Sequence, residues 1–542
     1  MNLLERNKLG SRLRPVLSGL ARTVLFALIL ILSCTFKVAK DPGVLIMQIN
    51  SEPGILNPIL ATDSNAYQVL GYIYETLLDL DNETLEYKPL LAESWEVSED
   101  HHTYTFNLRK DVKWQDGYPF TADDIIYSYS VIMDPKVDAA VYRAGLGDIE
   151  NVEKLSDHSV KFVYKKPYFR GLLVCGGISI VPKHIFDDGT DFNKHPANRN
   201  PIGTGPYIFK EWKTKRKIVL ESNGSYWKKP PELKGLVFQI IEDSTVPLQQ
   251  LKKGEIDMAE LRAIQWERST GSRAFNARFN KVKYYLPQYS YIGWNIKKPF
   301  FSDARVRRAM SMMIDKQKIL EKLSFGLGIV VEGPQYYFSD SYGHNIKPDP
   351  FDPKAAAKLL DEAGWIDHDG DGIRDKDGIP FKFDYCYVAS SVSASRIGTM
   401  LREDLSKTGI VMNMKGLEFN ALIKVIDERS FDAITLAWSV PFENDPYQLW
   451  HSSQIEDGSN YVGFSNKEAD EVIEAIRVEF DKEKRDELYK RLQMILHIEQ
   501  PYTFLFNPAT LLAYSKRFTN VKLYKVGVDI REWGIDTTVV SE

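Results

Sequence analysis

The chain has 542 residues, of which 69 are basic and 74 acidic, for a net charge of −5. This length exceeds what one hydrophobic core supports, so we expect two or three lobes. The charges are mixed, without a basic stripe, which argues against nucleic acid as a partner. No apolar run in the middle of the chain is long enough to span a bilayer.

The amino-terminal segment predicts targeting. A basic region that includes Lys8, Arg12, Arg14 and Arg22 precedes nine consecutive apolar residues at 24–32. Nine are too few for a bilayer that needs about 20, but they are typical of a signal peptide. The run ends at Ser33-Cys34, which resembles a bacterial lipobox. Residues 1–33 are therefore predicted to be a signal peptide, Cys34 the lipidated first residue of the mature chain, and 34–43 a lipid-anchored linker. A simple secretory signal or an uncleaved anchor is the alternative.

Cysteine usage agrees with this interpretation. The chain contains only Cys34, Cys175 and Cys386, and lipidation of the first explains the odd count. Cys175 and Cys386 are predicted to be buried small apolar residues, although a disulfide between them stays open. There is no C-x-x-C and no zinc-ligand spacing.

The first half of the mature chain alternates strand and helix patterns. Residues 44–50 predict a buried strand, and an apolar stripe predicts a helix over 65–78. Alternating apolar residues predict strands at 104–108 and 160–164. Thr121 followed by Asp124 predicts a capping box for a helix that stops at Asp134-Pro135. Strands that alternate with helices indicate α/β lobes with mixed sheets.

Helix starts continue through the second half. Ser302 and Asp303 cap a predicted helix whose three arginines are expected mainly on its solvated face, with a ligand-carboxylate clamp as the alternative. Asp352-Pro353 begins another helix, which Gly364 ends. Ser465 and Glu468 predict a capping box for a third. The three arginines are Arg305, Arg307 and Arg308.

An aspartate-rich loop follows the helix that ends at Gly364. Six residues occupy positions 1, 3, 5, 6, 9 and 11 of an EF-hand-like loop, and such clustered hard oxygens suit calcium. Gly378 stands at position 12, where a bidentate Glu belongs. The predicted calcium ligands are therefore incomplete, and the alternative is a surface turn before the strand at 381–383. The six residues are Asp367, Asp369, Asp371, Gly372, Asp375 and Asp377.

The stretch 431–465 carries the candidate binding site. Its apolar run at 433–437 predicts a strand covered on both faces, which ends at Trp438. Glu443 and Asp445 follow in an acidic loop. Because ligands of open α/β sheets bind outside the carboxyl ends of strands, Trp438 and the two acids form a candidate site. The alternative is a core tryptophan and solvated loop acids.

Motifs for catalysis are missing. The chain has no G-x-S-x-G, no H-E-x-x-H, no Walker A motif and no complete G-x-G-x-x-G, and its nine histidines are scattered. We therefore predict that the protein is not an enzyme, with a secreted hydrolase as the alternative.

Many short motifs follow one another along the predicted mature chain. They are Ala92-Glu93-Ser94-Trp95, the strand at 104–109, Lys113-Trp114, Asp116-Gly117, 121–124, 203–207, 223–228, 254–257, Gly293-Trp294-Asn295, Pro299-Phe300, 303–316, the helix start at Ser465 and Gln500-Pro501-Tyr502. Together and in this order they resemble the extracellular solute-binding proteins of family 5, which are the oligopeptide-, dipeptide- and nickel-binding proteins of ABC importers. The resemblance runs from residue 44 to about residue 530.

The resemblance implies an α/β fold of the two-lobe periplasmic-binding-protein type (type II, cluster C-like), with mixed sheets and an extra inserted subdomain. Lobe I would comprise 44–64, 205–288 and 518–542. The inserted subdomain would span 65–204 and lobe II 289–517. The lobes would close around the ligand by a hinge motion.

The resemblance also implies a role in transport. We expect a monomeric lipoprotein in the periplasm or at the cell surface, anchored to the membrane by its lipid. It would capture di- or oligopeptides and deliver them to ABC permease subunits and their ATPases. A nickel chelate or another small solute in the same role is the alternative.

The ligand contacts are the part of the family pattern that this chain changes. Peptide binders carry an Asp three residues after the tryptophan, which pairs with the peptide's ammonium, but Pro441 stands there. Glu443 is the expected substitute, with Asp445 next, because a buried ammonium needs a carboxylate. The other predicted contacts are the backbone of Ser439 and Val440, apolar walls from Trp438, Trp114 and Trp294, and Asn295 beside Trp294.

Overall fold

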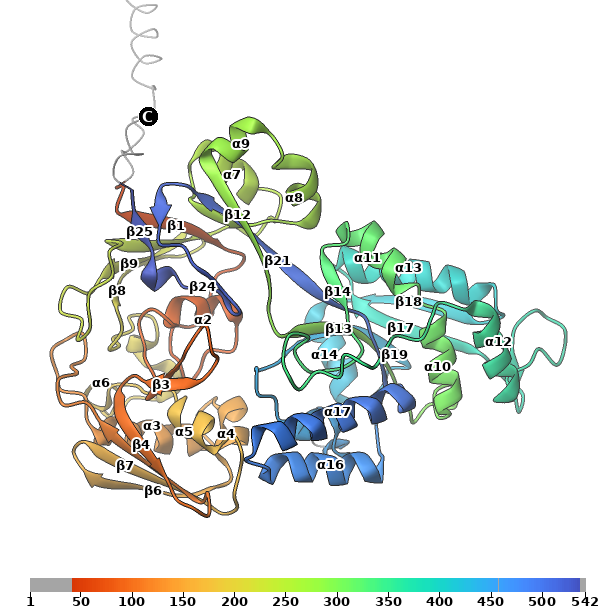
Figure 1. The fold of residues 1–542 in the computed structure, drawn as a ribbon, viewed down its shortest axis with the longest axis horizontal. Helices are drawn as coiled ribbons and strands as arrows, with labels where there is room; N and C mark the ends of the chain where they lie inside the picture. The colour runs from red at the N-terminus through yellow and green to blue at the C-terminus, as the bar shows by residue number, and fades with distance from the viewer. Residues whose placement is uncertain (1–40, 457, 537–542) are drawn as a thin grey trace, which may run out of the picture.

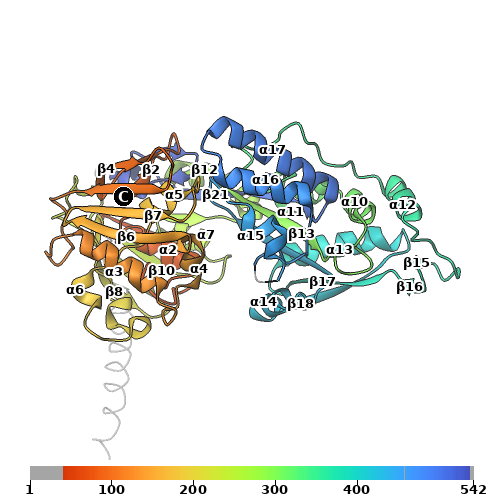
Figure 2. The ribbon, with the colours of Figure 1, turned by 90° about the horizontal axis from the view of Figure 1, so that it is seen from below.

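The computed structural model describes residues 41–456 and 458–536. The predicted signal peptide, Cys34 and most of the predicted linker lie outside these residues. The described chain forms two lobes joined in the middle by neighbouring strands, with a subdomain packed on the first lobe (Figures 1 and 2). This is the α/β architecture with mixed sheets that the sequence predicts.

Lobe I is built on one large mixed sheet. Its strands lie in the order β12-β21-β11-β1-β10-β9-β8, and β1 is parallel to both of its neighbours. The strands are β1 (Val44–Ile49), β8 (Tyr207–Lys213), β9 (Lys217–Ser222), β10 (Gly235–Ile240), β11 (Met258–Glu260), β12 (Phe279–Tyr285) and β21 (Phe506–Ser515). The helices are α2 (Ser64–Leu70), α7 (Pro247–Lys253), α8 (Ala263–Ser269) and α9 (Arg273–Arg278).

The segment between α2 and β8 forms the inserted subdomain. Its antiparallel sheet has the order β4-β5-β7-β6, and α3 packs on it (Figure 2). The sheet comprises β4 (Ala92–Val97), β5 (Thr103–Leu108), β6 (Ile149–Ser156) and β7 (Ser159–Tyr164). The other elements are β2 (Leu78–Leu80), β3 (Tyr87–Pro89), α3 (Ala122–Met133), α4 (Ala140–Leu146), α5 (Gly171–Gly176) and α6 (Lys183–Phe186).

Gly203 shows why the motif at the end of the subdomain needs glycine. A Cβ atom at Gly203 would lie 1.9 Å from the carbonyl oxygen of Ile73, so any side chain there would displace the backbone. Gly205 donates its N–H to the same oxygen at 2.8 Å. The two glycines therefore let the returning chain pack directly against the backbone of the segment that left lobe I.

Lobe II is a mixed five-stranded sheet with helices on both faces, in the order β18-β17-β19-β13-β20. Its strands are β13 (Gln288–Trp294), β17 (Lys382–Val388), β18 (Val411–Leu417), β19 (Ala433–Ser439) and β20 (Tyr502–Phe504). One face buries Trp294 against α10 (Ala304–Met312), α12 (Pro353–Glu362) and α13 (Val392–Ser406). The other buries Tyr291 against α16 (Lys467–Val478) and α17 (Lys482–Glu499). The remaining elements are α11 (Lys316–Ser324), β14 (Gly328–Val330), β15 (Asp375–Lys376), β16 (Ile379–Pro380), α14 (Phe419–Asp427) and α15 (Tyr447–Trp450).

The chain crosses between the lobes twice. The first crossing joins β12 to β13, close to the predicted boundary at 288. The second lies within β21, because Ala509 to Ser515 pair with β12 in the sheet of lobe I while Phe506 to Pro508 pair with β14. The second boundary therefore falls before the predicted residue 517. Four short strands end the described chain: β22 (Phe518–Thr519), β23 (Leu523–Tyr524), β24 (Gly527–Val528) and β25 (Gly534–Ile535).

Local sequence signals are confirmed where capping is strong. The capping box of Thr121 and Asp124 opens α3, which ends before Asp134 as predicted. Two helix boundaries differ from the prediction. The helix expected over 65–78 ends at Leu70, because the chain turns at Gly71 to bring β2 into a hairpin. Asn466, not Ser465, caps α16, since its side chain accepts the N–H of Ala469.

Arg307 departs from the expectation of a solvated helix face. It is 2% exposed and donates to the carbonyl oxygens of Phe301 at 2.7 Å and Glu499 at 2.8 Å. Burial lowers the pKa of Arg307 to about 10, so its guanidinium stays charged at neutral pH. Arg305 and Arg308 lie at the surface, where each pairs with an aspartate. Arg307 therefore links α10 to the end of α17.

Cys175 and Cys386 are both buried and unbonded to each other, which confirms the prediction of small apolar residues. Burial raises the pKa of the Cys386 thiol to about 11, so it is uncharged at neutral pH. Across residues 41–456 and 458–536, no helix is long and apolar enough to cross a membrane.

Candidate functional site

The strand β19 carries the predicted site into the centre of the lobe II sheet. It runs antiparallel to β13, with Trp438 opposite Tyr289 and Leu436 opposite Tyr291. Paired residues share a face of the sheet, so these side chains lie on the face covered by α16 and α17. Trp438 is half-buried, and its ring is parallel to that of Tyr461, with 6.5 Å between centroids.

Aromatic polar atoms gather beneath this end of β19. The hydroxyl of Tyr502 lies close to the side chains of Trp438 and Tyr291, and the rings of Tyr291 and Tyr502 stack at 3.9 Å. Trp438 Nε1 and both hydroxyls are buried without a well-formed hydrogen bond. Burial raises the pKa of Tyr502 to about 12, so the phenol remains a hydrogen-bond donor. Buried donors of this kind are satisfied by water or by a bound molecule.

The two predicted acids lie in the loop after β19, and each already has an arginine partner. Glu443 Oε1 lies 3.2 Å from Nη2 of Arg485, which α17 supplies. Asp445 Oδ2 accepts hydrogen bonds from Arg477 Nε at 3.0 Å and from the Tyr168 hydroxyl at 2.9 Å. A free carboxylate waiting for a ligand ammonium is therefore not what the structure presents.

Tyr168 belongs to the inserted subdomain, so Asp445 also connects the two halves of the molecule. Four further contacts also join the inserted subdomain to lobe II. The N–H of Phe169 donates to the Arg477 carbonyl at 3.0 Å, Arg477 pairs with Asp148 at 3.5 Å, Arg485 lies over the Phe169 ring, and the rings of His101 and Phe480 stack at 3.7 Å. We call this set of contacts the inter-lobe seam. It lies where α4 and α5 approach α16 and α17 (Figure 1).

Arg170 is a residue that the sequence did not indicate. Its Nε is buried without a hydrogen-bond partner, and no ion pair of its guanidinium is found in the described part of the chain. Its charge lowers the pKa of Tyr489, whose pKa is nevertheless raised by burial, and Glu443 and Arg485 act on the same phenol. Arg170 therefore adds a positive charge that acts on the same phenol as Glu443 and Arg485. Arg170 stands in an apolar stretch without an acidic residue at a characteristic spacing, so the sequence offers no motif that would have identified it.

Four predicted contact residues have structural roles instead. Trp114 is 2% exposed and donates Nε1 to Asp124 at 3.3 Å within the subdomain core. Trp294 is fully buried and donates Nε1 to Thr503 at 3.0 Å. Asn295 bonds to the carbonyl of Phe431 at 2.8 Å. The N–H of Val440 is occupied by Pro287 O at 2.9 Å, whereas Ser439 is exposed. The prediction of apolar walls from Trp114 and Trp294 was wrong, since both rings fill cores.

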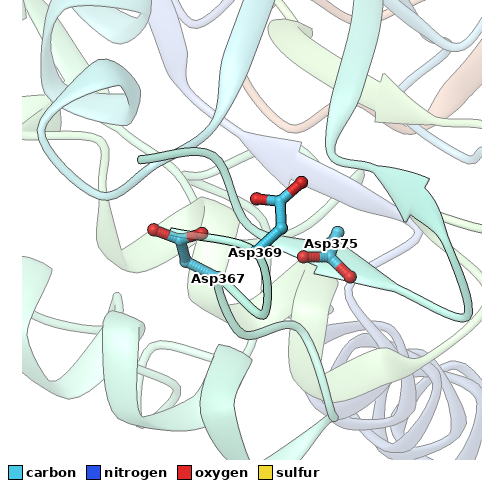
Figure 3. A group of neighbouring side chains, drawn as sticks. All are labelled: Asp367, Asp369 and Asp375. Atoms are coloured by element: carbon cyan, nitrogen blue, oxygen red, sulfur yellow. The ribbon is translucent and has the colours of Figure 1, made fainter. Parts of the chain in front are cut away.

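The aspartate-rich loop is exposed and lies between α12 and the β15–β16 hairpin. Carboxylate oxygens of Asp367, Asp369 and Asp375 lie within 4.8 Å of one another (Figure 3), and Asp371 is not a member of this group. Asp367 accepts the N–H groups of Gly370 and Gly372, which closes the turn without an ion. Of the predicted calcium ligands Asp367, Asp369, Asp371 and Asp375, three are thus grouped, and occupancy by calcium stays a prediction.

Two α/β lobes joined by two strands, with a subdomain inserted into the first, define the class of two-lobe binding proteins. The family model "Bacterial extracellular solute-binding proteins, family 5 Middle" matches residues 86–460, and the chain belongs to this family. The resemblance seen in the sequence is thereby confirmed. The family consists of extracytoplasmic solute-binding proteins rather than enzymes.

Individual relatives bind different solutes. The oligopeptide-binding protein AppA of Bacillus subtilis (strain 168) is 31% identical over 90% of both chains. Its structure with a nonapeptide has a TM-score of 0.79 and covers 91% of this chain and 99% of AppA, at 30% identity. NikZ from Campylobacter jejuni in complex with Ni(L-His) has a TM-score of 0.77 at 26% identity, covering 91% of this chain and all of NikZ. The heme-binding protein A of Haemophilus influenzae is 28% identical over 82% of this chain and 84% of its own.

Proposed function

We propose that this protein is a lipid-anchored binding protein that captures peptides between its two lobes and delivers them to an ABC permease. The similarity to AppA over nearly the whole of both chains supports the peptide class. The lipobox-like Cys34 supports the anchor, and the family supports the transport role.

The observation that carries the proposal is the inter-lobe seam. The lobes are joined by strands at one side, through β12 and β21, and meet again through Tyr168 and Asp445 at the other. A molecule between them would contact both lobes only when the seam is formed. Binding would then shift the protein toward this closed form, which is how a two-lobe protein couples capture to a shape that a permease can recognise.

A non-peptide solute is the second candidate, and the charges near β19 favour it. The expected ammonium partner is replaced by Pro441, both nearby acids have arginine partners, and Arg170 adds positive charge. A ligand with a carboxylate and no free ammonium, such as an organic metal chelate, matches this balance.

Native mass spectrometry of the protein purified from its own host tests the proposal. Co-purified peptides would support the first candidate, and a metal chelate or another small molecule would support the second. Turnover of a bound peptide would contradict a pure binding role. Replacing Cys34 with Ala tests the anchor separately: the variant should move from the membrane to the soluble fraction, and unchanged membrane association would favour an uncleaved anchor.

A further inference from the structure

A pocket of about 370 Å³ lies at the hinge, apart from the seam and from the loop after β19. Residues 261–264 of lobe I form one wall, 322–327 and 392–396 of lobe II form the other, and residues 508–511 of the hinge strand β21 lie between them. The volume is in the range of small-molecule sites. In Figure 1, α8 and α11 stand on the opposite side of β21 from α4 and α17.

The charged residues of this pocket are all basic. Arg262, Lys322 and Arg396 line it, and no acidic residue does. Within the described ranges, none of these three basic side chains has a carboxylate within 4.0 Å. The charge of Arg262 lowers the pKa of Asp243, but Asp243 is not at ion-pair distance and does not line the pocket. Many other surface cations of this chain do pair with acids, for example Lys154 with Asp123 at 2.7 Å. The pocket is therefore a place of uncompensated positive charge.

The same pocket presents apolar surface from both lobes. Ile264 at the start of α8 is 43% exposed and Val392 at the start of α13 is 57% exposed, and both line it. Leu261 and Leu511 contribute buried apolar floor at 4% and 3% exposure. Covering such side chains is favourable because it removes apolar area from water.

We propose that this hinge pocket binds a small amphiphilic anion, a carboxylate with a short alkyl chain. The basic rim would hold the carboxylate through charge-assisted hydrogen bonds, and the alkyl chain would cover the leucines and Ile264. Two arginines are well suited to this, because the guanidinium fork matches a carboxylate.

Binding there would also act on the hinge. Arg262 belongs to lobe I and Arg396 to lobe II, so one anion contacts both lobes only at a particular hinge angle. Because the pocket lies behind the hinge, opening the seam would bring its walls together and expel the anion. The anion therefore favours the closed form and strengthens solute binding, and the solute strengthens anion binding by the same factor. This coupling rests on the proposed function, whereas binding of the anion does not.

Calorimetric titration with octanoate tests the site. Wild type should bind one octanoate per chain, whereas octylammonium and acetate, which lack the negative charge or the chain, should bind far more weakly. The double variant Arg262→Ala/Arg396→Ala should lose about tenfold or more in octanoate affinity. Arg402→Ala, on the same helix α13 but outside the pocket, should bind as wild type does. The proposal is overturned if the double variant and wild type bind octanoate with equal affinity. This is also the result expected if octanoate binds only at the solute site.

The hinge effect has its own readout. Spin labels at Glu99→Cys and Lys484→Cys, both exposed, flank the contact between His101 and Phe480. In a Cys34→Ala background the two remaining cysteines are buried. Octanoate should increase the dipolar broadening between the labels as the seam closes. Binding without any change in broadening would refute the coupling and leave the proposed transport role unaffected.

Discussion

Tyr168→Phe removes one hydrogen bond across the inter-lobe seam and nothing inside either lobe. The lost bond joins the Tyr168 hydroxyl to Asp445 at 2.9 Å, with Tyr168 8% exposed and the Asp445 side chain 12% exposed. Burial and the Asp445 charge raise the pKa of Tyr168, so the phenol donates at every physiological pH. A hydrogen bond to a charged group contributes about 1.5–3 kcal/mol. The closed form should therefore become roughly 10- to 150-fold less populated relative to the open one.

Two measurements check this. Small-angle X-ray scattering of the unliganded protein should show a larger radius of gyration for Tyr168→Phe. Affinity for the solute identified by mass spectrometry should fall by up to the same factor, because binding must then supply the closing free energy. Tyr118→Phe is the matched control, since Tyr118 lies in the same subdomain, is 57% exposed and stacks on His184 instead. Unchanged affinity and an unchanged radius for Tyr168→Phe would show that the seam does not control closure.

Three further predictions concern charged groups. Because Arg485 already neutralises Glu443, Glu443→Gln should weaken the binding of a free peptide and of its N-acetylated form equally in calorimetric titrations. If only the free peptide loses affinity, Glu443 is the partner of the ligand ammonium after all. Burial raises the pKa of Glu75 above its ordinary 4.5, against the opposing hydrogen bonds of Tyr226 and Trp227. The neutral carboxyl of Glu75 therefore contributes its full stabilisation below about pH 4.5, and this stabilisation is lost as pH rises through the folded-state pKa. In Glu75→Gln, the free energy of unfolding in urea should consequently depend less on pH above pH 4.5 than it does in wild type. If wild type and variant change in parallel, Glu75 is not responsible. Any calcium bound at the loop of Asp367 and Asp375 should affect stability alone, so EGTA should change the melting temperature at most. A loss of solute affinity on chelation, with the fold intact, would contradict this.

Much of the fold could be predicted because its signals are local. Strands β1, β5 and β7 follow from apolar alternation or apolar runs, and the start of α3 follows from Thr121 and Asp124, whose capping groups are three residues apart. The strand β19 and its end near Trp438 follow from one apolar run. Periodicity and capping depend on neighbours in the chain, and the sequence alone therefore determines them. The family motifs are also visible in the sequence, but the reason for Gly203, its close approach to the Ile73 carbonyl, is a tertiary contact.

The partners of the candidate site were decided by the tertiary structure. Arg485 meets Glu443 from 42 positions later in the chain, and Tyr168 meets Asp445 from 277 positions earlier. Which side chain neutralises which acid depends on how α17 packs on the sheet and how the subdomain meets lobe II. No local pattern encodes such distances, because a carboxylate accepts any cation that the packing brings within reach. For the same reason Trp114 and Trp294, which resemble binding-site aromatics in the sequence, lie in the cores of the subdomain and of lobe II.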